Sequence, residues 1–372
     1  MTYLDHAASS PLRPEALEAM MPWFGEQHAN PTAAHRRGRR ARQALDEARA
    51  VIADATGFPR GDVVFTGGAT ESDNMAIGRD RAPGTIVIGA TEHPAVLEPA
   101  ERQGANIAQA DEFGVVGVDA VMEHVTEDTT VVSVMAVNNE IGVVQPVSAI
   151  AEAVREVAPN ARVHSDAVQA LPWLDLTDAI SGIDLVSITA HKIGGPQGVG
   201  AILVGPGSMP EPVLIGGGQE RDRRAGTQNV AGIVGFAAAL QASVDDRAQR
   251  LDRIDRLATR LLEGLMSRID GLRPTVPREL AVPGIVHVLV PGVQSEPLLF
   301  LLDQQGLACS AASSCASGAQ GASHVLAAMD LDTTDHAPLR LSLGWSSTDA
   351  DVDTALELIP AAVEQLKGAG NG

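Results

Sequence analysis

The stretch Asp184-Leu-Val-Ser-Ile-Thr-Ala-His-Lys192-Ile-Gly-Gly-Pro-Gln-Gly-Val-Gly200 combines a short apolar strand, a histidine–lysine pair and a glycine-rich turn. The chain has 27 Lys plus Arg residues, yet only Lys192 and Lys367 are lysines. A charge that follows an apolar run is costly unless it is paired or neutral. Unlike Arg, a lysine amine can lose its proton and attack a carbonyl. Lys192 is therefore a candidate for covalent chemistry, with a paired structural lysine as the alternative.

Strands and helices alternate on both sides of this stretch. Apolar or β-branched runs, separated by helical patterns, lie at 62–66, 85–89, 130–137, 162–165, 185–189 and 199–204. This rhythm predicts an α/β fold with a mostly parallel mixed sheet flanked by helices. We expect a large domain over residues 15–250 and a small α+β domain formed by residues 1–14 plus 251–372. A helical region at 230–269, with a break, would link them.

Polar side chains follow the carboxyl ends of the predicted strands. They are Thr66 to Thr70, His93, Asn138 to Glu140, Asp166, Gln169, His191 and Lys192. In open α/β sheets ligands bind at that edge. Single residues have ordinary alternatives, because Asp166 could cap a helix, Asn139 could hold a turn and His93 could be a half-buried histidine. Their common position favours one ligand site.

Pyridoxal phosphate is a ligand that would contact these residues together. Its aldehyde would form a Schiff base with Lys192, and its phosphate would meet the helix start at Ala69 and Thr70. Asp166 would keep the pyridine nitrogen protonated. The other assignments are Gln169 to the phenolic oxygen, His93 to ring stacking, Thr189, His191 and Thr227 to the phosphate, and Arg340 to a substrate carboxylate. Without a cofactor, the glycine-rich turn is an ordinary strand–helix connection capped by Thr70.

Both cysteines, Cys309 and Cys315, lie in one Ala/Ser/Gly loop. Their spacing gives neither a disulfide framework nor a zinc site, which favours a reduced compartment and at least one free thiol. Cys315 has small neighbours and could reach a bound substrate to attack a sulfur atom. Cys309 is interpreted as a small buried filler. We expect no metal site, and a transient iron–sulfur contact at Cys315 stays open.

The net charge argues against nucleic acid as a partner, and the lengths of the apolar runs argue against a membrane helix. With 27 basic and 47 acidic residues the net charge is −20, which argues against nucleic acid. The local exception, Arg36-Arg37-Gly-Arg39-Arg40, is interpreted as a solvated helix start. No run reaches the roughly 18 apolar residues that a membrane helix needs. The N-terminus shows no signal-peptide pattern, so we expect a cytoplasmic protein.

Motifs in a fixed order run through nearly the whole chain: Tyr3-Leu-Asp5, Phe65-Thr-Gly-Gly-Ala-Thr-Glu-Ser-Asp-Asn74, Asn138-Asn-Glu-Ile-Gly142, His164-Ser-Asp-Ala-Val-Gln169, Gly216-Gly-Gly-Gln-Glu-Arg221 and Ser313-Ser-Cys-Ala-Ser-Gly318. In this order they resemble the cysteine desulfurases. These are pyridoxal-phosphate enzymes of fold type I in the class V aminotransferase family. The nitrogen-fixation and iron–sulfur-assembly type is the more similar one.

The resemblance implies a substrate, a product and a set of residue roles. The substrate is L-cysteine, the product is L-alanine, and the sulfur is left as a persulfide on Cys315. Lys192, Cys315 and His93 are the catalytic candidates, whereas Asn139 contacts both cofactor and substrate and Arg340 contacts the substrate. The resemblance also implies a homodimer, in which Thr227 reaches the neighbouring subunit's phosphate, and a sulfur-acceptor or scaffold protein.

The sequence departs from the family at the substrate entrance. His6-Ala-Ala-Ser-Ser10 stands where Asn/Ala-Ala-Thr-Thr is usual, and Ala312 and Ala322 replace a usual Gly and Pro beside the cysteine loop. Two other functions stay open: a related lyase such as one acting on selenocysteine, and a phosphate- or nucleotide-binding protein without the cofactor. The destination of the sulfur also stays open among iron–sulfur assembly, tRNA thiolation, and DNA or metabolite sulfuration.

Overall fold

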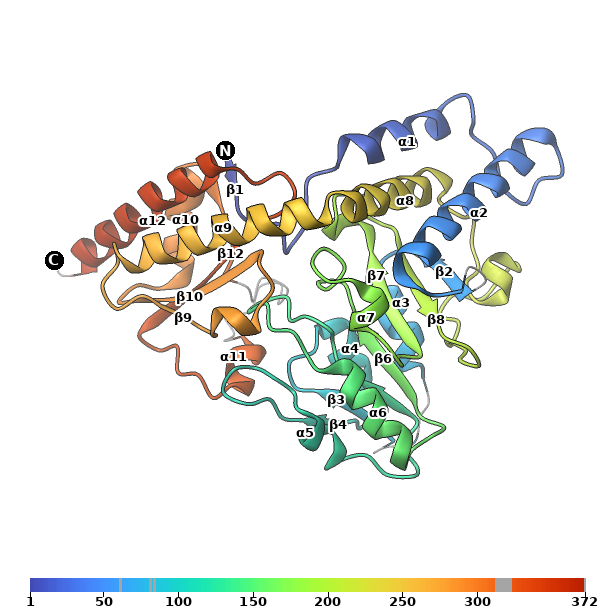
Figure 1. Cartoon of the computed structure of the whole chain (residues 1–372), viewed down its shortest axis with the longest axis horizontal. Helices are drawn as coiled ribbons and strands as arrows, with labels where there is room; N and C mark the ends of the chain where they lie inside the picture. The colour runs from blue at the N-terminus through green and yellow to red at the C-terminus, as the bar shows by residue number, and fades with distance from the viewer. Residues whose placement is uncertain (60–61, 80–81, 83–84, 312–322, 371–372) are drawn as a thin grey trace.

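A seven-stranded mixed sheet forms the centre of the computed structural model, which describes residues 1–372 except 60–61, 80–81, 83–84, 312–322 and 371–372 (Figure 1). In spatial order its strands are β2 (Val63–Thr66), β8 (Gly200–Val204), β7 (Leu185–Thr189), β6 (Arg162–Asp166), β5 (Val131–Ser133), β3 (Ile86–Gly89) and β4 (Asn106–Ala108). β3 to β7 are mutually parallel, whereas β8 is antiparallel to β2 and β7. The predicted α/β class and mostly parallel sheet are confirmed.

Most side chains on both faces of the sheet are apolar, because helices cover both faces. Val63 and Phe65 of β2 face the main core, whereas Val64 between them packs in a second core with Met75 and Ile202. This alternation follows from the two-residue period of a strand. The covering helices are α1 (Pro14–Phe24), α2 (Arg36–Thr56), α3 (Ala69–Ile77), α4 (Pro94–Glu101), α5 (Val118–Met122), α6 (Val147–Val157), α7 (Leu176–Ala179) and α8 (Val230–Asp245).

Two smaller sheets lie at the other end of the molecule (Figure 1). The antiparallel one contains β12 (His336–Ser342), β10 (Ile285–Pro291) and β9 (Arg273–Pro274), and the parallel pair is β1 (Thr2–Tyr3) with β11 (Leu307–Ala308). Their helices are α9 (Arg247–Met266), α10 (Ser295–Gln304), α11 (His324–Ala328) and α12 (Asp349–Gly370). The predicted break in the long helical region falls at Asp246, between α8 and α9. The domain boundaries stay a prediction.

Helix α2 begins at Arg36, because the His35 ring caps it by accepting from Gly38 N (3.1 Å). One local prediction needs correction. The apolar run at 130–137 is a regular strand only over Val131–Ser133, since after it the chain bonds to β6 without pairing with β3. The apolar residues of this run are buried as expected. Their apolar character did not show which of them form hydrogen bonds with both neighbouring strands of the sheet.

Residues 2–13, here called the N-terminal strap, join the small sheets to the turn that carries Lys192. At one end, Leu4 N donates to Ala308 O (2.8 Å). At the other end, the strap gives donors to four consecutive carbonyls of the lysine turn: Ser10 N to His191 O (2.8 Å), Ser10 Oγ to Lys192 O (3.0 Å), Arg13 Nε to Ile193 O (3.0 Å) and Arg13 N to Gly194 O (2.8 Å). The strap therefore fixes the backbone of this turn.

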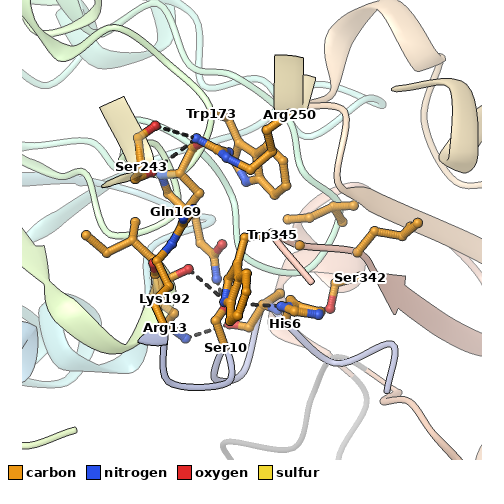
Figure 2. A pocket seen from close by; sticks show the side chains of 16 residues that line it. His6, Ser10, Arg13, Gln169, Trp173, Lys192, Ser243, Arg250, Ser342 and Trp345 are labelled. Carbon is orange, nitrogen blue, oxygen red and sulfur yellow. Dashed lines mark hydrogen bonds between the residues drawn. The ribbon is translucent and has the colours of Figure 1, made fainter. Parts of the chain in front are cut away.

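Arg13 is buried where the strap, the lysine turn and the start of α9 meet. Its Nη2 lies 2.9 Å from Asp246 Oδ2, and its guanidinium stacks 5.1 Å from the centroid of the Trp345 ring. Figure 2 shows Arg13, Ser10 and Lys192 around a cavity of about 20 Å³, which has room for about one water molecule. None of the helices in the described ranges is both long and apolar enough to cross a lipid bilayer.

We predict that Arg13→Met lowers the free energy of unfolding by about 1–3 kcal/mol, because the buried carbonyl of Ile193 loses its side-chain donor and the half-buried Asp246 loses one of its two arginine partners. Urea unfolding monitored by far-UV circular dichroism measures this change. The control is Arg256→Met, which removes an ion pair with Asp349 that is exposed on both sides. That variant should keep the wild-type midpoint. Equal midpoints for both variants would contradict a structural role for Arg13.

Candidate active site

A cavity of about 520 Å³ opens at the carboxyl ends of the parallel strands. Ten of the twelve site residues predicted from the sequence line it: Ala69, Thr70, His93, Asn139, Asp166, Gln169, Thr189, His191, Lys192 and Arg340. Thr227 does not line this cavity and is exposed on the loop before α8. Cys315 lies outside the described residues. The strap adds Ala7, Ala8 and Ser9, which belong to the stretch expected at the substrate entrance.

Lys192 ends a short 3-10 turn, η2 (Ala190–Lys192), directly after β7. Its Nζ donates to Ala7 O (2.5 Å) and Ala8 O (2.9 Å) of the strap. Gln169 Nε2 donates to the same Ala7 carbonyl (2.7 Å). Carbonyl acceptors satisfy the amine by hydrogen bonds without adding a counter-charge. The strap thus holds both the backbone and the amine of Lys192 at the cavity wall.

The glycine-rich turn before α3 forms an anion cradle on another wall. Gly68 has φ +148°, in the region that favours glycine. A Cβ on Gly200 would lie 2.9 Å from Gly68 Cα and 2.7 Å from Ile188 O, so β8 must pass this turn without a side chain. The first N–H groups of a helix lack intrahelical acceptors, and its dipole favours an anion. Ala69 and Thr70 can therefore hold a phosphate at the N-terminus of α3.

His191 lies beside this cradle. Burial, with a smaller effect of Lys192, lowers its pKa to about 4, so the ring is neutral near pH 7. Its Nδ1 lies 3.4 Å from the Ser9 hydroxyl. Thr189 Oγ1 donates to Val199 O (3.1 Å), which uses its hydroxyl hydrogen on the backbone. Both side chains are fixed polar groups on the wall that holds Lys192.

Asp166 ends β6 and is nearly fully buried. Its Oδ1 accepts from Val168 N (2.9 Å). Burial raises its pKa, whereas His93 and Lys192 act in the opposite direction. A cationic group in the cavity would therefore stabilise the ionised form of Asp166.

His93 caps α4 and faces the same cavity. Its Nδ1 accepts from Ala95 N (3.1 Å), so in a neutral ring the proton is on Nε2. Burial is the main cause that lowers the pKa of His93, which favours the neutral ring. A flat, neutral imidazole with one N–H suits stacking on an aromatic ligand.

Arg340 reaches the cavity from β12 of the small sheet. Its Nη2 donates to Asp5 Oδ1 of the strap (2.8 Å) and its Nη1 to Asn139 O (2.9 Å). Its buried Nε has no hydrogen-bond partner among the described residues. Asp5 and Asn139 therefore hold the guanidinium of Arg340 at the cavity, and a guanidinium is a planar donor that suits a ligand carboxylate.

The comparisons with known proteins agree with this geometry. The model of the family "Aminotransferase class-V" matches residues 2–355. The chain belongs to the class-V aminotransferase family. It is 40% identical over 391 residues to the IscS-like cysteine desulfurase of Mycobacterium tuberculosis, and the match covers 99% of this chain and 98% of that one. The solved structure of a NifS-like protein has a TM-score of 0.90 at 32% identity, covering 98% and 100% of the two chains.

A further solved structure similar to this chain is that of SspA in complex with cysteine. It has a TM-score of 0.80 at 28% identity, and the match covers 92% of this chain and 99% of SspA. Members of the class-V aminotransferase family depend on pyridoxal phosphate, so the predicted family and cofactor are confirmed at this level.

The residues present fit this cofactor of the family. The glycine cradle at Gly68 fits its phosphate, and the buried Asp166 carboxyl fits a protonated ring nitrogen. His93 would lie against the ring and Lys192 would bind the aldehyde. The fit rests on the chemistry of these side chains and on the close packing of the cradle, where a Cβ at position 200 would clash with Gly68 and Ile188.

Of the two cysteines, Cys309 lies within the described residues. Cys309, directly after β11, is partly buried, and burial raises its pKa to about 12, with Asp5 adding to this effect. It is therefore a thiol at neutral pH and a poor nucleophile. This agrees with its interpretation as a filler.

We predict that borohydride reduction of the holoenzyme attaches the cofactor at Lys192. Because the chain has only one other lysine, Lys367→Ala is the matched control and should keep the label. Lys192→Ala should lose both the label and the visible absorption of the bound cofactor. Peptide mass spectrometry identifies the site. A label on Lys367, or none in the wild type, would contradict the assignment.

Proposed function

We propose that the chain is a pyridoxal-phosphate-dependent cysteine desulfurase that forms L-alanine and a persulfide on Cys315. The observation that carries the proposal is the convergence of Lys192, Asp166 and Arg340 on one cavity, from β7, β6 and the small sheet. The similarity to full-length cysteine desulfurases supports it. The bound cysteine of SspA supports the choice of substrate.

The cofactor, when bound, supplies an electron sink that stabilises negative charge on the substrate carbon. Asp166 would supply the negative charge that pairs with a protonated ring nitrogen. Arg340 and Asn139 orient the substrate carboxylate. Lys192 anchors the cofactor and afterwards carries protons at Nζ, where the strap carbonyls of Ala7 and Ala8 receive the amine.

The sulfur step belongs to Cys315. Its thiolate attacks the substrate Sγ, so that an S–S bond forms while the C–S bond breaks. The electron pair of the broken bond remains with the substrate carbon, which takes up a proton and leaves as alanine. Cys309 is excluded from this step because burial raises its pKa and because it does not line the cavity.

The proposal includes a homodimer, a sulfur-acceptor or scaffold protein, and a cytoplasmic location. Thr227 is exposed and outside the cavity of its own chain, so it is available to a neighbouring subunit's phosphate. Helix α1 exposes Leu17, Met21 and Phe24, which supports contact with another protein surface. The partly buried thiol of Cys309 suits a reducing compartment.

We predict that Cys315→Ser lowers sulfide release from L-cysteine at least about a hundredfold, because the acceptor thiol is lost. Cofactor absorption should be retained, since the proposal gives Cys315 no role in holding the cofactor. Cys309→Ser is the matched control and should keep most of the activity. Full activity of Cys315→Ser would instead indicate a lyase that needs no thiol, such as one acting on selenocysteine.

A further inference from the structure

A row of buried polar side chains crosses the middle of the main sheet beside the cavity. His164 of β6 lies at its centre, with Nδ1 2.9 Å from Ser133 Oγ on β5 and Nε2 3.0 Å from Ser187 Oγ on β7. Asp73 of α3 completes the row, with Oδ1 3.6 Å from His164 Nε2. Placing polar groups in the centre of an apolar sheet costs free energy. Packing alone therefore does not explain this row.

Asp73 is the member that reaches the active-site cavity. It lines the cavity and is 1% exposed. Neither of its carboxyl oxygens has a hydrogen bond of good geometry within the described part of the chain, although the Ser187 hydroxyl is near enough to stabilise the ionised form. An ionised carboxylate in such a place would lack the donors that buried charges need.

The charged groups that act on Asp73 are themselves acidic. Asp166 and Glu92, which are both buried, each oppose its ionisation. Among the elements packed against α3, the strands β2, β7 and β8 carry no titratable side chain, and the two glutamates of α4 are exposed. The imidazole of His164 is the basic group beside Asp73 in this row.

Burial decides the protonation of both partners. It raises the pKa of Asp73 well above its usual value, with Asp166 as the second cause, and it lowers the pKa of His164 to about 3. A neutral acid beside a neutral imidazole is therefore the favoured state near pH 7. A second carboxylate at this position would repel Asp166 and oppose its ionisation.

We propose that Asp73 is a positioning residue for the cofactor site: a carboxylic acid kept neutral in the Ser133–His164–Ser187 row, so that the negative charge opposite the ring nitrogen belongs to Asp166. The inference rests on the proposed function for its purpose. The protonation of Asp73 itself can be tested without turnover.

Proton linkage gives the first test. If Asp73 is neutral in the folded enzyme, folding takes up one proton at pH values above the unfolded pKa of about 3.9. A raised pKa makes the wild type lose stability as pH rises, and Asp73→Asn removes this loss. The folding constant of the variant relative to wild-type holoenzyme should therefore rise about tenfold per pH unit between pH 5 and 7. Urea unfolding at each pH measures the ratio.

The control is Asp128→Asn, which changes an exposed acid and should give a ratio independent of pH. A flat ratio for Asp73→Asn would show that Asp73 is ionised in the folded enzyme and would overturn the proposal. In the same variant, the pH midpoint of cofactor absorption should stay within about one unit of the wild type, because one neutral group replaces another. A larger shift would also overturn it.

Infrared spectroscopy provides a test that does not depend on the stability of Asp73→Asn. Wild-type holoenzyme labelled with carbon-13 aspartate should show the carbonyl stretch of a protonated carboxyl at pH 8. The band should remain in Asp166→Asn, which removes the neighbouring acid. Its absence in both proteins would overturn the proposal. Failure of cofactor labelling at Lys192 would instead contradict the proposed function and leave the infrared result intact.

Discussion

Four hydrogen bonds between the N-terminal strap and the lysine turn hold the active site in register. Ser10 and Arg13 donate to every carbonyl from residue 191 to 194, and the Lys192 amine returns to the carbonyls of Ala7 and Ala8. Because these bonds join segments about 180 positions apart, the turn is not free to move along the sheet edge. The reactive amine is thereby fixed by backbone contacts on two sides.

The same strap connects the second half of the site. Its Asp5 holds Arg340, and its first residues pair with β11. The group proposed to bind the substrate carboxylate and the group proposed to bind the cofactor thus share one support. A strap that moved would displace Lys192 and Arg340 together, which explains why the beginning of the chain matters for chemistry at residues near its middle and its end.

The active site combines buried carboxyls with a cradle for an anion. Asp73 and Asp166 line the cavity and Glu92 is buried close to Asp166, and burial raises the pKa of each. The phosphate cradle lies at the N-terminus of α3, the helix that also carries Asp73, and backbone N–H groups there provide the positive end of a dipole. A neutral Asp73 therefore keeps a carboxylate charge away from this end of α3.

Sequence reasoning found the residues that follow strands, since β-branched runs fix the strands and parallel strands end at one edge. It therefore expected His93, Asp166 and Lys192 at one edge of the sheet, and all three line the cavity. It expected His6 to Ser10 at the substrate entrance but missed that the strap holds the lysine turn. Two-residue strands carry no periodicity, and Thr2 pairs with Leu307, about 300 residues further along the chain. It quoted Asp73 within a motif but gave it no role, since burial against His164 depends on the packing of α3.

Residue-resolved hydrogen exchange of the native enzyme tests the role of the strap most directly. The amides of Ser10 and Arg13 donate to the lysine turn, so we expect their protection to match that of the β7 amides. They should then open together with the main sheet. Exchange of these two amides at the rate of an unstructured peptide, with β7 still protected, would show that the strap does not hold Lys192 in place.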